Sequence, residues 1–195
     1  MKMYPISEIF SSIQGEGSFL GCPATFIRFS GCNLNCPWCD TDFSFKKYMT
    51  VDEIVSFVEY QKVIITGGEP TLYDLEPLLV KLKELGKIVM LETNGTNPTD
   101  KIRHLIDWIV CSPKPEVNWE INERCLFDEL KYVVDGQFNP KLHIKEDIKQ
   151  KYKDKIWLQP ESSRFYERAK QAFEMAMKEP YLRVGLQMHK IINVR

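Results

Sequence analysis

Three cysteines stand close together in the first quarter of the chain, in the run Cys32-Asn33-Leu34-Asn35-Cys36-Pro37-Trp38-Cys39. Three thiolates on one short loop can bind a single metal centre. A structural zinc site is usually closed by four ligands, and a structural 4Fe-4S cluster usually takes four cysteines. A set of three therefore predicts an iron–sulfur cluster with one iron left open to an exogenous molecule.

The spacing alone leaves a second interpretation open, a zinc knuckle completed by a distant ligand. Its candidate fourth ligands are Cys22, Cys111, Cys125, His104, His143 and His189. The three cysteines outside the run are otherwise expected to be small buried residues.

Composition limits the class of protein that must position these thiols. The chain has 195 residues, 44% of them hydrophobic, with 26 Lys+Arg against 27 Asp+Glu. This length suits one domain, or two very small ones, with enough apolar residues to form a core, and we predict a single domain over residues 1–195. A net charge of -1 gives no general attraction to nucleic acid. No secretory signal and no apolar run of membrane-spanning length is visible, so we expect a cytoplasmic protein with reduced thiols.

Short apolar runs alternate with segments of helical periodicity, which predicts βαβ units and a parallel sheet. The capping-box pattern from Thr50 to Glu53 opens one expected helix. Leucines from 75 to 85, followed by Gly86, predict a second helix, and a stripe from Phe165 to Ala176 after Ser162 and Ser163 predicts a third. A charged segment over 141–153 is a fourth candidate. The predicted strands are Ala24–Phe29, Val63–Thr66, Ile88–Glu92, Trp108–Cys111, Leu130–Val134 and Ile156–Gln159.

Polar clusters follow five of the six predicted strands. The carboxyl ends of parallel strands meet at one edge of a sheet, where ligands bind in barrels and open α/β folds. Five such loops therefore predict one site. The clusters are Cys32–Asp40, Gly67-Gly68-Glu69-Pro70, Glu92-Thr93-Asn94-Gly95, Ser112-Pro113-Lys114 and Gln159-Pro160-Glu161.

The cysteine run with Trp38 before its last cysteine, together with Gly67-Gly68-Glu69-Pro70 after the second strand, resembles the radical S-adenosylmethionine (SAM) superfamily. The resemblance implies a 4Fe-4S cluster whose open iron binds the amino and carboxylate groups of SAM. It implies that SAM is cleaved to a 5'-deoxyadenosyl radical, which abstracts a hydrogen. The implied fold is a partial, compact (β/α)6-type barrel with parallel strands.

Further motifs resemble the 7-carboxy-7-deazaguanine synthase family within that superfamily. This resemblance implies conversion of 6-carboxy-5,6,7,8-tetrahydropterin to 7-carboxy-7-deazaguanine with loss of ammonia, on the route to queuosine. A glycyl-radical activating enzyme is one alternative, but it does not explain Gln14–Gly17 or Cys39-Asp40-Thr41. A non-enzymatic zinc or iron–sulfur module is the other. The motifs are Ser12–Gly17, Gly21–Pro23, Phe26–Arg28, Gly31–Leu34 with Trp38–Thr41, Glu92–Thr96, Ser112–Lys114 and Gln187–Lys190.

The resemblance also implies roles for individual residues, and Mg2+ as a further cofactor. Taken alone, Arg28 could instead form a structural ion pair, Thr41 could end a turn and His189 could be a packed side chain. The implied ligands are Cys32, Cys36 and Cys39 for the cluster and Thr41 for Mg2+. The implied substrate residues are Ile13, Gln14, Gly15, Glu16, Arg28, Thr93, His189 and Arg195. The implied SAM residues are Trp38, Cys39, Asp40, Gly68, Glu69, Gly95, Ser112, Pro113, Lys114, Gln159, Pro160, Glu161 and Ser162.

The segment between Thr41 and Gly67 is short, with room for one compact helix. A barrel built this way would be open on one side, which would expose radical intermediates to water. We therefore expect a homodimer or a closing tail to cover the site. The superfamily also implies a flavodoxin or ferredoxin as electron donor.

Overall fold

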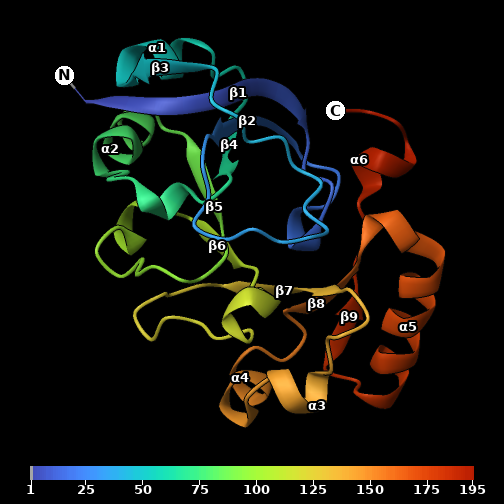
Figure 1. Cartoon of the computed structure of the whole chain (residues 1–195). Helices are drawn as coiled ribbons and strands as arrows, with labels where there is room; N and C mark the ends of the chain where they lie inside the picture. Colours follow the sequence, from blue (N-terminus) through green and yellow to red (C-terminus); the bar gives the residue numbers. More distant parts are fainter. Residues whose placement is uncertain (1) are drawn as a thin grey trace.

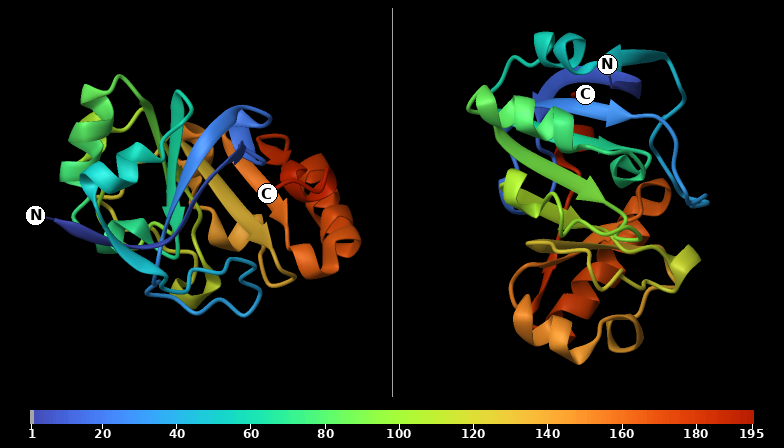
Figure 2. Two further views of the ribbon diagram at one scale, coloured as in Figure 1. Left: turned by 90° about the horizontal axis from the view of Figure 1, so that it is seen from above. Right: turned by 90° about the vertical axis from the view of Figure 1, so that its left-hand side faces the viewer.

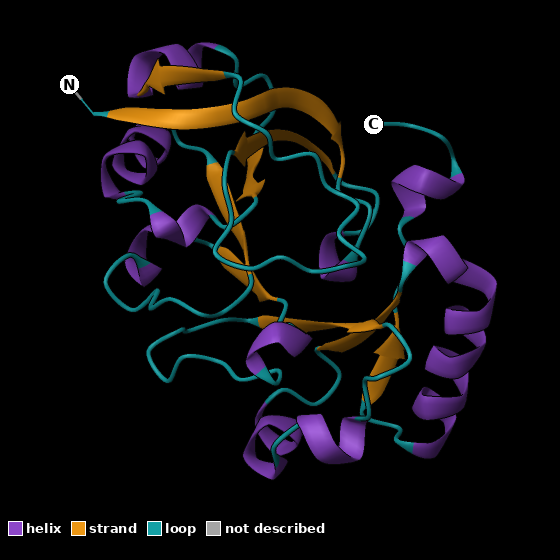
Figure 3. Ribbon diagram, viewed as in Figure 1, coloured by secondary structure: helices purple, strands orange, loops and turns teal. Residues whose placement is uncertain are grey.

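The computed structural model, which describes residues 2–195, is built on a curved sheet of nine strands (Figures 1 and 3). The strands lie in the order β3-β1-β2-β4-β5-β6-β7-β8-β9, and the edge strands β3 and β9 do not pair, so the barrel is open. The strands are β1 (Met3–Ile13), β2 (Pro23–Phe29), β3 (Lys47–Thr50), β4 (Lys62–Gly67), β5 (Ile88–Thr93), β6 (Trp108–Cys111), β7 (Glu129–Val134), β8 (Ile156–Pro160) and β9 (Leu182–Val184).

The six strands expected from apolar runs are present as β2 and β4 to β8, and neighbours among them are parallel. The α/β fold class with a partial barrel is thus confirmed. Three further strands were not expected. β1 runs antiparallel to β2 and β3 at one edge. Pro5, and the serines and the glutamate that interrupt its apolar residues, kept β1 from being predicted. β9 is parallel to β8 but has only three residues.

Helices cover the outer face at the two ends of the sheet, α1 and α2 at one end and α5 at the other (Figures 1 and 2). The crossovers from β5 to β6 and from β6 to β7 carry short 3-10 turns in place of α-helices. The helices are α1 (Val51–Ser56), α2 (Glu76–Glu84), α3 (Pro140–His143), α4 (Glu146–Lys151), α5 (Phe165–Lys178) and α6 (Met188–Ile191), and the 3-10 turns are Gly17–Phe19, Pro70–Leu72, Arg103–Leu105, Pro115–Val117 and Ser162–Arg164. None of the helices in residues 2–195 has the length and apolar character that crossing a membrane requires.

Local sequence signals explain most of these helices and fail at three places. The capping box at Thr50 forms, and Gly86 ends the turn after α2 with a φ of 68°. The charged segment 141–153 forms two short helices, α3 and α4, instead of one. Ser162 begins a 3-10 turn in which the Glu161 side chain accepts from the Ser163 N–H. The residue at the N-cap of α5 is Arg164, so the two serines are not its caps. Phe173, expected in the α5 stripe, is 57% exposed.

Two core clusters lie between the sheet and the helices on its outer face, one at each end of the sheet. A third, smaller cluster fills the inside of the barrel. Buried aliphatic side chains of β4 and β5 pack beneath α1 and α2. A second cluster lies beneath α5 around β7 and β8. Inside, Phe19 packs edge-on against Trp108, with ring centroids 5.3 Å apart, and covers Ile64 and Met90. This plug leaves the carboxyl edge of the strands as the open end of the barrel.

The capping box gives the first testable prediction. Thr50→Ala removes the hydroxyl that accepts from the Glu53 N–H, and we expect a loss of about 1 kcal/mol in the free energy of unfolding. Glu53→Gln is the matched control, because an amide can still accept from the Thr50 N–H, and it should cost less. Urea unfolding measures both. Equal stability of Thr50→Ala and wild type would show that the cap carries no energy here.

Candidate active site

A cavity of about 410 Å3 opens at the carboxyl edge of the strands, between the loop after β2 and the C-terminal segment 187–195. It collects residues from distant parts of the sequence, including every residue assigned above to the cluster, to Mg2+ and to the substrate. These are Cys32, Cys36, Cys39, Thr41, Ile13, Gln14, Gly15, Glu16, Arg28, Thr93, His189 and Arg195. Of the residues expected around SAM, the wall includes Trp38, Asp40, Gly68, Ser112, Lys114, Gln159, Pro160, Glu161 and Ser162.

Three residues expected around SAM do not line the cavity: Glu69, Gly95 and Pro113. Other lining residues lie in the predicted site clusters or family motifs but received no individual role: Phe26, Leu34, Asn35, Gly67, Glu92, Asn94, Gln187 and Lys190. The sequence held one signal for the rest, a lysine within the predicted apolar strand Leu130–Val134. The lining residues outside every cluster and motif are Glu8, Phe10, Asp42, Phe43, Thr66, Lys131 and Val133.

The three cysteines face one end of the cavity. Burial raises the pKa of the Cys32 thiol and raises that of Cys36 to about 12, and in both cases the nearby Cys39 contributes. In residues 2–195, no three His, Cys, Asp or Glu side chains gather closely enough to hold one metal ion. Three thiols on one cavity-lining loop are a donor set of the kind that iron–sulfur clusters take.

Glu69 is a buried carboxylate that fixes two of the loops at this edge. It accepts hydrogen bonds from the Thr71 N–H and hydroxyl, from the Thr93 hydroxyl at 2.8 Å and from the Asn94 N–H at 2.6 Å. Its neighbour Gly68 packs so closely that a Cβ there would lie 1.9 Å from the Gly31 carbonyl oxygen. The carboxylate thus ties the loop after β4 to the end of β5, and Gly68 seats the cysteine loop on both.

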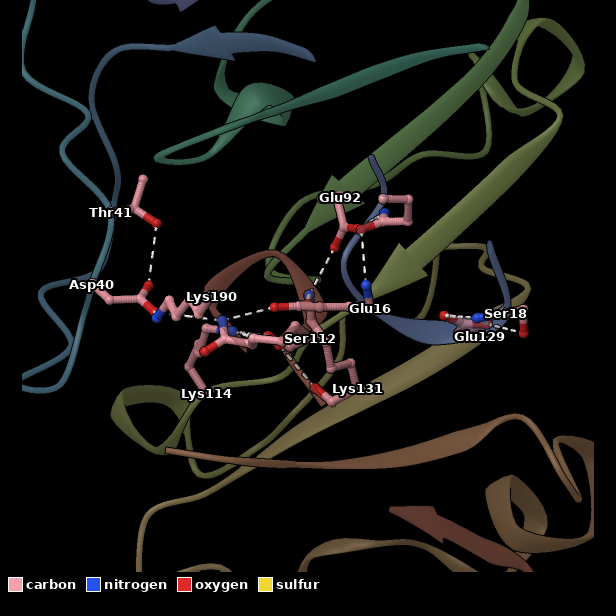
Figure 4. Close-up of polar contacts among 12 residues, drawn as sticks. Glu16, Ser18, Asp40, Thr41, Glu92, Ser112, Lys114, Glu129, Lys131 and Lys190 are labelled. Carbon is pink, nitrogen blue, oxygen red and sulfur yellow. Dashed lines mark hydrogen bonds and ion pairs between the residues drawn. The ribbon is translucent and has the colours of Figure 1, made fainter. Parts of the chain in front are cut away.

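A buried network of charges occupies the cavity wall beneath the predicted pterin residues (Figure 4). The Lys131 ammonium lies 2.5 Å from a Glu16 oxygen and 3.0 Å from a Glu92 oxygen. Gln14 donates to the other Glu92 oxygen, and Gln187 donates to the other Glu16 oxygen. Burial opposes the ionisation of Glu16, but Lys131 keeps the pKa of this carboxyl below its usual range.

Lys114 is a second buried lysine on the same wall. It donates to the Ser112 carbonyl at 2.8 Å and to the Ser112 hydroxyl at 2.6 Å, and it lies 5.7 Å from the centre of the Trp38 ring. Burial lowers the pKa of Lys114, and the positive charge of Lys131 adds to the effect. The ammonium is thereby held beside the cysteine loop, where an anionic group would be attracted to it.

Arg28 combines two of the roles weighed above. Its Nε donates to Glu8 at 2.8 Å, which is an ion pair within the protein, and its guanidinium also lines the cavity. The Arg195 side chain reaches the same Glu8 carboxylate. Both guanidinium groups lie over the Phe10 ring, at 5.6 and 5.0 Å from its centre. The outer wall therefore carries two cations against one carboxylate, which suits an anionic ligand.

The C-terminal segment forms part of the cavity wall, against the turn after β1 and the cysteine loop. The Met188 N–H donates to the Gly15 carbonyl at 2.9 Å, and a Cβ on Gly15 would lie 1.9 Å from the His189 ring. Lys190 forms an ion pair with Asp40 of the cysteine loop, and the same aspartate accepts from Gln187 at 3.4 Å. A closing tail was one of the two arrangements expected from the sequence. Gln187, His189, Lys190 and Arg195 of the C-terminal segment do line the cavity.

Comparisons with known proteins agree with this geometry. A model of the Radical SAM superfamily matches residues 26–124. A Bacteroides thetaiotaomicron protein named 7-carboxy-7-deazaguanine synthase is 42% identical over 99% of this chain and 100% of its own. One of the same name from Aquifex aeolicus is 36% identical over 97% of this chain and 94% of its own. A solved structure titled "Crystal structure of QueE from Escherichia coli" superposes with a TM-score of 0.75 at 28% identity, covering 96% of this chain and 95% of that one.

The ion pair between Lys190 and Asp40 predicts a pH dependence of stability. Burial opposes the charge on Asp40, but the Lys190 ammonium keeps its pKa below the usual value. A depressed pKa adds stability above the unfolded-state pKa of about 3.9, and this is lost as the pH falls through the folded-state value. Lys190→Met should cost about 0.5–1 kcal/mol at pH 7, because both groups are partly exposed, and nothing in strong acid.

Urea unfolding at a series of pH values checks this. The matched control is Lys81→Met. The Lys81 ammonium lies 3.9 Å from a Glu84 oxygen on the exposed face of α2, so this pair should contribute little to the free energy of unfolding. A Lys190→Met deficit that stays constant down to acid pH would contradict the role given to Asp40.

Proposed function

Because the chain belongs to the 7-carboxy-7-deazaguanine synthase family of the Radical SAM superfamily, we propose that it converts 6-carboxy-5,6,7,8-tetrahydropterin to 7-carboxy-7-deazaguanine with release of ammonia. This is a step towards queuosine and other 7-deazapurines. One observation carries the proposal: a single cavity brings together the three cysteines, the SAM loops and the complete set of expected substrate residues.

The cluster and SAM would occupy the end of the cavity beneath the cysteine loop. When bound, they supply the 5'-deoxyadenosyl radical that abstracts hydrogen from the substrate. Cys32, Cys36 and Cys39 would hold the cluster, with the Lys114 ammonium nearby. The residues that line the cavity around SAM would be Trp38, Asp40, Gly68, Ser112 and Gln159–Ser162. Glu69 would act by fixing Gly68 and the end of β5, since its own carboxylate is occupied by four donors.

The pterin would lie between the acidic wall and the arginine wall. Its aminopyrimidinone edge presents N–H donors, which suit the Glu16 carboxylate. Its carboxylate suits the guanidinium of Arg28, a planar fork of donors. Thr93 and His189 would contact it from β5 and the tail. The C-terminal segment would then exclude water from the reacting ring.

Magnesium would be held at the turn after the cysteine run. The Thr41 hydroxyl donates to Asp40 at 3.4 Å and lines the cavity. Hydroxyl and carboxylate oxygens are the ligands that Mg2+ prefers, with substrate oxygens and water completing the shell. Thr41 is therefore the ligand we propose, with Asp40 as its neighbour.

The composition of the cavity wall bears on the alternative enzyme. A glycyl-radical activating enzyme needs an open groove that admits a polypeptide, and here residues 187–195 form part of the wall. We do not propose that activity. A flavodoxin or ferredoxin as the source of electrons, a homodimer and a cytoplasmic location are the further proposals that family membership supports.

The proposed reaction predicts a specific product. Protein reconstituted with iron and sulfide, then supplied with reductant, SAM, Mg2+ and 6-carboxytetrahydropterin without air, should form 7-carboxy-7-deazaguanine. Cys36→Ala should lose the cluster absorbance and the product but keep its far-UV circular dichroism, because Cys36 lies on a loop. Cys22→Ala, outside the run, should keep both. If 5'-deoxyadenosine forms without this product, the superfamily chemistry stands and the substrate is wrong.

The magnesium site predicts a separate effect. Thr41→Ala removes the proposed ligand oxygen, so the Mg2+ concentration for half-maximal activity should rise at least about tenfold, which corresponds to one lost charge-assisted contact. Thr41→Ser keeps the hydroxyl and should stay close to wild type. The site would be placed wrongly if alanine and serine had the same Mg2+ requirement.

A further inference from the structure

Lys131 is a buried charged residue in the cavity wall that neither the sequence motifs nor the proposed chemistry accounts for. It lies in the middle of β7, where its side chain is 15% exposed, and it contacts Glu16 (13% exposed) and Glu92 (17% exposed). Such buried charges are retained at a cost unless they are paired and hydrogen-bonded. A buried lysine in this place, shared by two carboxylates of the cavity wall, indicates a role in ligand binding.

The charges of this cluster do not cancel. One ammonium is shared by two carboxylates, which leaves one net negative charge on the wall. Gln14 and Gln187 occupy one oxygen each of Glu92 and Glu16. Each carboxylate oxygen accepts more than one hydrogen bond, so the cavity-lining Glu16 keeps acceptor capacity for a ligand. The wall is therefore a fixed anionic acceptor.

We propose that Lys131 is a positioning residue that holds the Glu16 carboxylate, ionised and in one place, against the two N–H donors of a 2-amino-4-oxopyrimidine ring. This inference rests on the proposed function, because it assumes that a pterin enters the cavity. The chemistry it selects is a paired donor edge. A 2,4-dioxo ring, which places a carbonyl where the 2-amino group stands, would set an acceptor against a carboxylate and be rejected.

Other charged groups face Glu16 and must be separated from the effect of Lys131. Glu92 competes for the same ammonium, and Glu129, which accepts hydrogen bonds from Ser18, lies close enough to act electrostatically on Glu92 and Lys131. Lys114 is a second cation near Lys131 and lacks a hydrogen bond to Glu16. His189 approaches Glu16 from the tail, and burial lowers the pKa of His189, which favours its neutral form. Lys131 is thus the cation bonded directly to Glu16.

The test is calorimetric titration of the cluster-loaded protein with SAM, without air, using pterin-6-carboxylate and its 2-oxo counterpart lumazine-6-carboxylate. Wild type should prefer the pterin by about 10- to 100-fold, the value of hydrogen bonds to a charged group, with little change between pH 6 and pH 8. Lys131→Met should lose most of this preference. Its pterin affinity should also weaken as the pH falls, because a buried Glu16 without its cation takes up a proton.

Three variants keep the outcome decisive. Lys131→Arg keeps the charge and should restore the preference to within about threefold of wild type. Glu92→Gln removes the competing carboxylate, so that Lys131 pairs with Glu16 alone, and this variant should also keep the preference for the pterin. It tests the proposal even if Lys131→Met does not fold. Lys83→Met is the control, since Lys83 pairs with Asp107 far from the cavity.

The results separate the two claims. If wild type binds neither ligand, the proposed function fails. If wild type binds the pterin and Lys131→Met shows the same preference and the same flat pH profile, the inference on Lys131 is overturned while the function stands. A loss of preference in Glu92→Gln equal to that in Lys131→Met would also overturn it, because ionisation of Glu16 would then not be the property that matters.

Discussion

One ammonium group shared by two buried carboxylates organises this protein's cavity. Lys131 comes from β7, Glu92 from β5 and Glu16 from the turn after β1. Burying an unpaired charge costs several kcal/mol, so these three segments must meet in one arrangement. Gln187 extends the constraint to the C-terminal segment by donating to Glu16. The antiparallel edge, the parallel sheet and the tail are thereby joined at Glu16, the residue that we propose accepts from the N–H groups of the pterin.

A second constraint, made by close backbone packing, positions the opposite end of the cavity. Glu69 fixes the loop after β4 against β5, and Gly68 leaves no room for a side chain against Gly31. The cysteine loop begins at that contact. The two constraints have different physical origins, one electrostatic and one steric, and together they set the distance between the proposed radical source and the proposed substrate.

The sequence made the parallel strands and the cysteine site predictable, because both rest on local patterns. Apolar runs followed by polar clusters predict β2, β4 to β6 and β8, and the three closely spaced thiols predict a metal-binding loop. β1 was not predicted because Pro5 and its interspersed serines and glutamate do not form the pattern of a buried strand. The pairing of Lys131 with Glu16 escaped for another reason: 115 residues separate them. Such a contact arises from the topology of the sheet, which no local pattern encodes.

The central claim is that the pterin lies with its donor edge on the Glu16 wall and its carboxylate on the arginine wall. A crystal structure of the cluster-loaded protein with SAM and pterin-6-carboxylate tests it most directly. We predict a Glu16 oxygen about 3 Å from the ring N–H groups and an Arg28 nitrogen about 3 Å from the ligand carboxylate. A pterin bound in the reverse orientation, or outside the cavity, would contradict the account.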